Sequence, residues 1–105
     1  MLLNDEELGH EYLPIEGLAL YLETSQRLVF GAEAEAIVER RVASVQTLSG
    51  TGALSLGATF LSRFLPASDA RKVYVSDPPY VNHIPILRHA GLETDLYPYL
   101  SLIHI

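Results

Sequence analysis

The hydrophobic and polar positions of the chain recur with two different periods, which predicts helices and strands in alternation. The clearest helical period runs from Thr51 to Leu65, with one apolar stripe and one polar stripe. The apolar stripe comprises Leu54, Gly57, Ala58, Leu61 and Leu65, and the polar stripe comprises Ser55, Thr59, Ser62 and Arg63. Pro66 follows at once, as is typical after the end of a helix.

A second amphipathic helix is predicted over Gly17–Phe30, between Pro14 and Gly31. Its apolar face carries Leu18, Tyr21, Leu22 and Val29, and its polar face carries Glu23, Gln26 and Arg27. The other predicted elements are a short acidic helix over 33–40, a short strand over 42–46, a buried strand over 72–76, a turn over 77–79, a helix over 82–90 stopped by Gly91, and a strand over 92–99. This alternation predicts the α/β class, with a partial parallel-type sheet and flanking helices.

Composition and charge narrow the function. The 105 residues are 49% hydrophobic and 19% charged, which is typical of one small globular domain. The formal net charge of -6 argues against a nucleic-acid surface. No apolar run reaches the roughly 18 residues of a membrane span, and the acidic start does not resemble a signal peptide. With no cysteine either, we expect a soluble cytosolic protein with no membrane partner.

Small, hydroxylated and glycine residues gather in QTLSGTGALSLG, residues 46–57, where the clearest helix is predicted to begin. The free N–H groups and the dipole of a helix start favour an anion such as phosphate, and glycines let it approach the backbone. Neither common phosphate fingerprint fits, because Ala58 replaces the Walker-type lysine and Ser55 replaces the third glycine of the dinucleotide motif. A helix capped by serine, with glycines kept for close packing, is the alternative.

A second polar cluster, SDPPYVNH, places Tyr80, Asn82 and His83 after a predicted strand, at the edge where parallel sheets bind ligands. Tyr80 can stack on a flat ring, and His83 can orient a polar group. The alternative is a purely structural cluster, with Asn82 capping a helix, Tyr80 half-buried and His83 in solvent.

The remaining titratable groups have no arrangement typical of catalysis. His10 and His89 lack metal-ligand spacing and are expected at the surface. Glu33, Glu35 and Glu39 are expected to form a solvated helix face and not an acid/base pair.

Four stretches carry a family resemblance by their order and separation: HEYLPIEGL, RVASVQTLSGTGAL, KVYVSDPPYVNH and HAGLE. Together they resemble the aspartate aminotransferase family, the class-I, fold-type I enzymes that use pyridoxal 5′-phosphate. The resemblance spans 10–99 and implies that residues 1–99 form an incomplete N-terminal part of the large, cofactor-binding domain of that fold.

The resemblance implies a role for four residues around the cofactor phosphate. Ser49, Gly50 and Thr51 match the family's phosphate-binding loop, in agreement with the anion argument. Tyr12 matches the tyrosine that reaches the cofactor phosphate of the neighbouring subunit. A homodimer is therefore implied as well.

The resemblance also assigns the second polar cluster to the cofactor ring. Tyr80 stands where the family usually has a tryptophan stacked on the pyridine ring, and Pro79 replaces a more usual serine or threonine. His83 matches a histidine that hydrogen-bonds the aspartate paired with the ring nitrogen.

The implied activity is amino-group transfer between L-aspartate and 2-oxoglutarate. In the family a lysine holds the cofactor as a Schiff base, but the only lysine here, Lys72, matches no catalytic position and is expected at the surface. The catalytic lysine, the ring-nitrogen aspartate and the substrate-binding arginines are therefore expected outside this stretch, and the chain alone is expected to be inactive. Two alternatives stay open: a specificity for aromatic amino acids in place of aspartate, and a mitochondrial location in place of the cytosol.

Two hypotheses from other classes are alternatives to the aminotransferase. One is a small non-enzymatic α/β module that binds a phosphorylated ligand, and the other is an acidic interaction domain without a site. An incomplete sheet is also expected to leave the side chains of Val73, Val75, Leu54 and Leu61 short of partners, so that the isolated chain aggregates or stays molten.

The last six residues, LSLIHI at 100–105, have the letters encoded by a transposase end sequence used in DNA library preparation. We therefore hypothesise that they are a non-native read-through tail, and His104 is left out of the functional interpretation. Resequencing the gene from unfragmented DNA should show another sequence after residue 99. Finding LSLIHI in frame there would refute the hypothesis.

Overall fold

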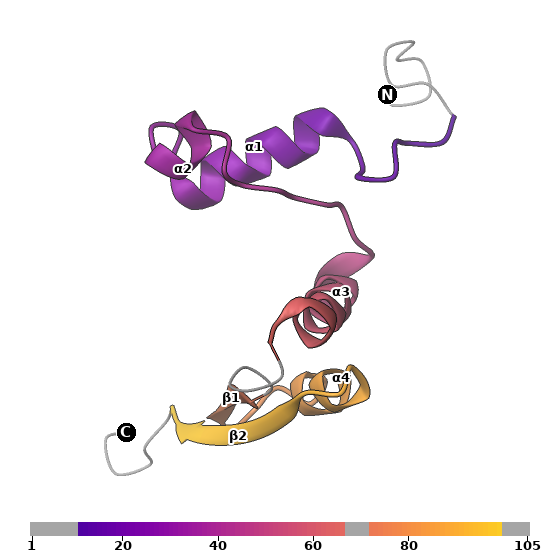
Figure 1. The fold of residues 1–105 in the computed structure, drawn as a ribbon, viewed down its shortest axis with the longest axis vertical. Helices are drawn as coiled ribbons and strands as arrows, with labels where there is room; N and C mark the ends of the chain where they lie inside the picture. The colour runs from indigo at the N-terminus through magenta and orange to yellow at the C-terminus, as the bar shows by residue number, and fades with distance from the viewer. Residues whose placement is uncertain (1–10, 67–71, 100–105) are drawn as a thin grey trace. The chain divides into compact units, whose positions relative to one another are not determined.

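The computed structural model describes residues 11–66 and 72–99, which belong to two units, one up to Gln46 and one from Thr47 onward (Figure 1). His10 and the suspected tail at 100–105 lie outside the described residues, so the predictions for them stay predictions. Every helix in the described part of the chain is too short or too polar to cross a bilayer.

The first unit contains α1 (Ala19–Phe30) and α2 (Glu35–Val38), which contact each other (Figure 1). The helix predicted over Gly17–Phe30 is confirmed, although it begins two residues later. Its predicted apolar face is only partly covered: Leu22 is half-buried, but Tyr21 and Val29 are 54% and 74% exposed. Among the described elements only α2 packs against this helix, and four residues cannot cover a face of this length.

The strand predicted over 42–46 is wrong. Its backbone is extended, but it pairs with no strand among the described residues. Two glutamine side chains hold it instead. The Gln26 amide donates to the Ser44 hydroxyl at 2.9 Å and to the Val42 carbonyl at 3.4 Å, while Gln46 bonds to the segment before α1. A β-like sequence becomes a strand only where a second backbone lies alongside it.

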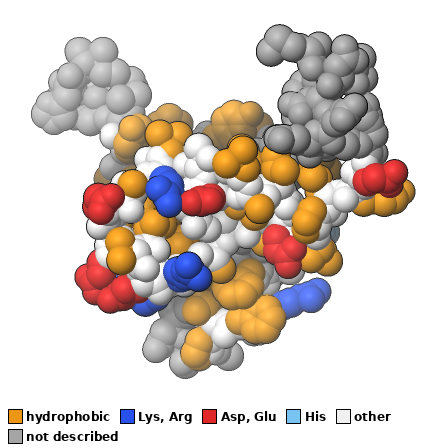
Figure 2. Space-filling model, turned by 90° about the horizontal axis from the view of Figure 1, so that it is seen from above, with side chains coloured by type: hydrophobic (Ala, Val, Ile, Leu, Met, Phe, Trp, Pro, Cys, Tyr) orange, Lys and Arg blue, Asp and Glu red, His pale blue; other side chains and the backbone are white. Residues whose placement is uncertain are grey.

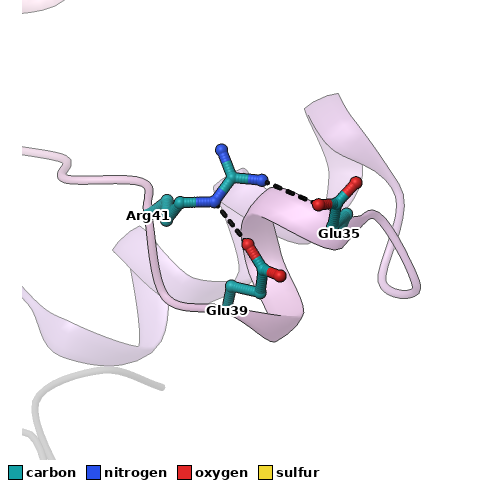
Figure 3. Close-up of polar contacts among 3 residues, drawn as sticks. All are labelled: Glu35, Glu39 and Arg41. Atoms are coloured by element: carbon teal, nitrogen blue, oxygen red, sulfur yellow. Dashed lines mark hydrogen bonds and ion pairs between the residues drawn. The ribbon is translucent and has the colours of Figure 1, made fainter.

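The acidic helix predicted over 33–40 is confirmed in a shorter form, as α2. Arg41 bridges two of its predicted solvated carboxylates, with Nη2 3.4 Å from Glu35 and Nε against Glu39 (Figure 3). All three side chains are at least half exposed, and Glu33 is exposed as well. Such surface pairs add little stability, so the carboxylates form a solvated face, as expected.

The second unit contains one parallel strand pair and two helices. Its elements are α3 (Ser49–Phe64), β1 (Lys72–Asp77), α4 (His83–His89) and β2 (Glu93–Pro98). The strands pair in parallel from Lys72 opposite Glu93 to Asp77 opposite Pro98, and α4 connects them (Figure 1). The predicted α/β class with a partial parallel sheet and flanking helices is thereby confirmed.

The core of this unit consists of four buried apolar side chains, which come from α3, β1, α4 and the residue just before β2. They are Ala58, Val75, Leu87 and Leu92. Leu54 packs against them, as its place on the predicted stripe requires, but Leu61 and Leu65 are 39% and 38% exposed. Ser62, predicted on the polar face, is half-buried instead. The packed side of α3 is therefore rotated away from the predicted stripe, because α4 and not a second sheet face lies against it.

The strand predicted over 72–76 exists, but it is not buried as a whole. Val75 is 5% exposed and Val73 is half-buried, whereas Tyr74 is 63% exposed. One face of the pair packs on the helices, and the other has no cover among the described residues. The expectation that apolar side chains lack partners is therefore wrong for Val75 and correct for Leu61.

Large apolar side chains stay open to solvent over both units, and Figure 2 shows several of them between the charged groups of one face. Because so few side chains are buried, we expect the isolated 105-residue chain to bind a hydrophobic dye such as ANS and to unfold without a sharp transition. Calorimetry and dye fluorescence measure both properties. A cooperative melt of a monomer without dye binding would contradict the expectation.

Candidate functional site

A cleft of about 350 Å³ in the second unit joins the start of α3 to the segment between β1 and α4. Its lining residues are Ser49, Gly50, Thr51, Leu54, Tyr80, Asn82, His83 and Ile86. The structure thus brings five of the six predicted site residues into one cleft. Tyr80 and His83 follow the carboxyl end of β1, which is where a parallel sheet was expected to bind a ligand.

The start of α3 offers a row of free donors to this cleft. Within the described residues, the backbone N–H groups of Ser49, Gly50 and Thr51 have no acceptor, and the first satisfied one is that of Gly52, bonded to the Leu48 carbonyl at 3.0 Å. Three unpaired N–H groups and the positive end of a 16-residue helix dipole favour an anion. The side-chain hydroxyls of Ser49 and Thr51 add two further donors to the same cleft.

The serine cap that was the alternative for this motif is wrong. Leu48 occupies the N-cap position, and no side chain caps the helix. Ser49 is instead the first helical residue, with φ of 55°, a left-handed conformation that costs a non-glycine residue about 1–3 kcal/mol. The Thr47 hydroxyl donates to the Ser49 carbonyl at 3.2 Å and supports this turn. The Ser49 hydroxyl therefore stays available to a ligand.

Gly50 and Gly52, at the start of α3, have different reasons to be glycine. A Cβ on Gly52 would lie 3.3 Å from the Leu48 Cβ, a close approach that packing requires. A Cβ on Gly50 would meet no described atom within 4 Å, and its φ is not left-handed. The close-packing alternative therefore holds for Gly52 alone. Neither the fold nor the backbone geometry explains Gly50, which lines the cleft beside the free N–H groups.

The opposite side of the cleft is aromatic. The rings of Tyr80 and His83 meet edge to face, with centroids 5.5 Å apart and planes at 63°, and the His83 N–H donates to the Tyr80 carbonyl at 3.1 Å. Tyr80 is 61% exposed and His83 is half-buried, the reverse of the structural alternative. Asn82 occupies the N-cap position of α4 but makes no side-chain cap bond. The purely structural interpretation of this cluster is therefore wrong for Tyr80 and His83, and for Asn82 it is correct only about the N-cap position.

Sequence reasoning missed the apolar walls of the cleft, Leu54 and Ile86. Leu54 lies one helical turn after Gly50 and Thr51, and Ile86 lies three residues after His83, so helical spacing from the predicted residues was the signal. These side chains make the space between the donors and the aromatic pair partly apolar, which suits a flat ring that carries an anionic group.

Three other residues singled out in the sequence are not among the described lining of the cleft. Tyr12 belongs to the first unit and is fully exposed, in the segment before α1. Lys72 is a surface residue, as predicted: its Nζ lies 3.4 Å from Asp95 Oδ2 on the neighbouring strand, with about half of each side chain exposed. His89, in the last turn of α4, is exposed as expected.

No charged side chain is among the described residues that line the cleft. An anion bound there meets backbone dipoles, hydroxyls and one imidazole, and no lysine or arginine side chain of the described lining. The described residues also contain no group of three or more His, Asp and Glu side chains that could hold a metal ion. The chemistry of the donors thus suits a phosphate-like group.

The first unit has a cleft of its own, of about 430 Å³, which none of the predicted site residues line. Its lining residues are Glu23, Gln26, Arg27, Ala36, Ile37, Arg40 and Val42. The Arg27 guanidinium is already paired with the Glu23 carboxylate at 2.9 Å. Despite its larger volume, this cleft lacks the row of free donors found at α3.

Comparison with known proteins identifies the family of the chain. Residues 3–102 match the family model for aminotransferase class I and II. The cytoplasmic aspartate aminotransferase of Saccharomyces cerevisiae is 45% identical over 96 residues, which is 91% of this chain and 22% of the relative. The chain therefore spans about a quarter of the length of the relatives that it matches.

Two solved structures share the fold. The aspartate aminotransferase from Saccharomyces cerevisiae cytoplasm superposes with a TM-score of 0.86 and 42% identity, over 98% of this chain and 24% of that one. An aromatic-amino-acid aminotransferase from Burkholderia pseudomallei, covalently bound to pyridoxal phosphate, gives a TM-score of 0.79 and 41% identity over 89% and 23%. With the family match covering nearly every residue, this chain belongs to the class I and II aminotransferase family.

Proposed function

We propose that this chain is the phosphate-holding part of a pyridoxal 5′-phosphate-dependent aminotransferase that moves an amino group between L-aspartate and 2-oxoglutarate. The observation that carries the proposal is the single cleft that joins three free N–H groups, two hydroxyls and an aromatic pair. Family membership and the yeast relative support it. The phosphate-binding module and the site-free acidic domain leave the family match unexplained.

The residues present fit the phosphate end of the cofactor. Ser49, Gly50 and Thr51 would hold that group with backbone N–H groups and hydroxyls, and Gly50 leaves the approach free of a side chain. Pyridoxal phosphate, when bound, supplies an electron-poor ring that accepts the electron pair left when the substrate's Cα proton is removed. Since no described lining residue is cationic, the remaining positive charge is proposed to come from residues outside this chain.

The aromatic pair would orient the ring. Tyr80 would stack on it in place of the family's usual tryptophan, with a smaller surface and one hydroxyl more. His83, whose main-chain N–H bonds to the Tyr80 carbonyl and whose ring packs edge to face on Tyr80, would offer a ring nitrogen to a carboxylate outside this chain. Nothing in the structure explains the replacement at Pro79.

Tyr12 is proposed to act in a homodimer, where it would donate its hydroxyl to the cofactor phosphate of the neighbouring subunit. Its full exposure suits a side chain that finds its partner outside its own subunit. The cleft of the second unit and Tyr12 of the first would then belong to different active sites of one dimer.

Catalysis is proposed to need residues that this chain lacks. Lys72 is exposed, paired with Asp95 and absent from the lining of the cleft, so it does not serve as the Schiff-base lysine in this proposal. The chain alone would then bind part of the cofactor without transferring an amino group. We place the whole enzyme in the cytosol, as the yeast relative is described, with the mitochondrion as the alternative.

Aromatic amino acids are the second candidate substrates, because the Burkholderia pseudomallei neighbour is an aromatic-amino-acid aminotransferase. The side-chain carboxylate of aspartate and an aromatic ring call for different groups in the substrate pocket. None of the described cleft residues is an arginine, so the described lining offers no guanidinium to the side-chain carboxylate of aspartate.

We predict that replacing Gly50 and Thr51 together by valine in the full-length protein weakens cofactor binding on the order of 100-fold, because one hydroxyl donor to a charged group and the open approach are both lost. Spectroscopic titration of the cofactor-free protein measures the dissociation constant.

The matched control is the double substitution Gly57→Val and Thr59→Val in the same helix. Gly57 also has open space at its Cβ, and the Thr59 hydroxyl bonds only to the Ser55 carbonyl one turn earlier. Both double variants place two β-branched residues in α3. Similar melting temperatures with different affinities would therefore show that the loss of affinity comes from the phosphate contacts at the start of the helix. Equal cofactor affinities of the two double variants would refute the proposal that residues 49–51 bind the phosphate.

For the substrate, we predict a higher kcat/KM with L-aspartate than with L-tyrosine for the protein encoded by the complete open reading frame, each with 2-oxoglutarate as acceptor. The 105-residue chain with added cofactor serves as the negative control and should transfer no amino group. A preference for L-tyrosine would establish the aromatic alternative, and turnover by the short chain would contradict the proposed absence of the catalytic lysine.

A further inference from the structure

Gln46 clamps the backbone on both sides of Gly17. Its main-chain N–H donates to the Glu16 carbonyl at 2.7 Å, and its side-chain Oε1 accepts the N–H of Leu18 at 3.0 Å. Gly17 lies between these bonds, buried and with φ of 110°. A Cβ on it would lie 2.3 Å from the Gln46 Cβ and 2.7 Å from Oε1. The clamp thus depends on a glycine for both its conformation and its close approach.

The clamp is the anchor of residues 11–16, here named the arm. The arm carries Tyr12 and two other exposed apolar side chains, Leu13 and Ile15. One turn precedes the clamp, in which the Gly17 N–H donates to the Pro14 carbonyl at 2.9 Å. In the described chain, the bond between Glu16 and Gln46 is the only backbone hydrogen bond from the arm to a distant segment. The direction in which the arm leaves the unit is therefore set at Gln46.

At the clamp the Gln46 side chain acts only as a hydrogen-bond acceptor. Leu18 is the N-cap residue of α1, and no side chain of its own turn caps that helix. The Gln46 side chain enters as an acceptor, from 28 residues away. An acceptor oxygen at this position is therefore what the clamp needs, and an apolar side chain of equal length cannot supply it.

We propose that Gln46 is a positioning residue that acts through Tyr12. By fixing the arm at Gly17, it holds the Tyr12 hydroxyl in the direction needed to reach the cofactor phosphate of the partner subunit, without itself touching the cofactor. The inference rests on the function proposed above. A pre-set arm loses less conformational entropy when Tyr12 binds, and this raises the affinity.

The test is a double-mutant cycle in the full-length protein. Gln46→Met removes the acceptor and keeps the length of the side chain, and Gln46→Glu keeps an acceptor oxygen. Each is made in the native protein and in the Tyr12→Phe background. The dissociation constant of pyridoxal phosphate, titrated into the cofactor-free protein, is the main readout, and the midpoint of urea unfolding is the second.

We expect Tyr12→Phe to weaken binding about tenfold, as for the loss of one hydrogen bond to a charged group, and Gln46→Met about fivefold, as for the loss of one neutral hydrogen bond. In the Tyr12→Phe background, Gln46→Met should change the affinity less than twofold, on the order of experimental error. Gln46→Glu should restore most of the loss. Gln46→Met should lower the urea midpoint equally in both backgrounds, because its effect on the free energy of unfolding does not depend on the Tyr12 hydroxyl.

The outcomes separate the inference from the function on which it rests. If Gln46→Met weakens binding by the same factor in both backgrounds, or leaves it unchanged in the native protein, the positioning role is wrong and the role of Tyr12 stands. If Tyr12→Phe has no effect on affinity, Tyr12 does not reach a cofactor phosphate, and both statements fall together.

Discussion

The packing of α3 against α4 is the contact on which the candidate site depends. It is made through a core of four apolar side chains, in which Ala58 of α3 meets Leu87 of α4, with Val75 from β1 and Leu92 from the residue just before β2. This contact brings the first turn of α3 to the segment after β1, and so places the free N–H groups opposite the ring of Tyr80. A small residue at position 58 allows the two helices to approach closely.

The first turn of α3 offers dipoles and not charges to an anion. The chain as a whole carries a formal charge of -6, and the described lining of the cleft adds no cation. Attraction over long range is therefore weak, and affinity depends on donors that are already in position. The left-handed φ of Ser49 and the bond from Thr47 to its carbonyl show how the backbone is held in that conformation before any ligand arrives.

Two glutamines organise the first unit in place of a sheet. Gln26 holds the extended segment at Ser44, and Gln46 holds the arm at Gly17. Side-chain amides can both donate and accept, so they satisfy backbone groups that a neighbouring strand would otherwise satisfy. The arm is thus anchored by Gln46 and not by a neighbouring strand. The role proposed for Tyr12 depends on this anchor.

Local patterns were sufficient for the features that depend on neighbours in the chain. The period of apolar residues located α1, α3 and α4, and the run from Ser49 to Thr51 located the donors, because helix geometry and helix starts are set within a few residues. The family landmarks added Tyr80 and His83 as partners of those donors. The structure then placed all five in one cleft.

Other features depend on what lies opposite a residue, and no local pattern contains that information. The segment 42–46 has the composition of a strand but meets side chains instead of a second backbone. Ser62 is half-buried and Leu61 is exposed because α4, and not a wider apolar layer, covers α3. Gly52 is needed for packing, whereas Gly50 faces open space, although the two lie only two residues apart in the same helix start. Packing partners, which are distant in the chain, decide burial, strand pairing and the use of each glycine.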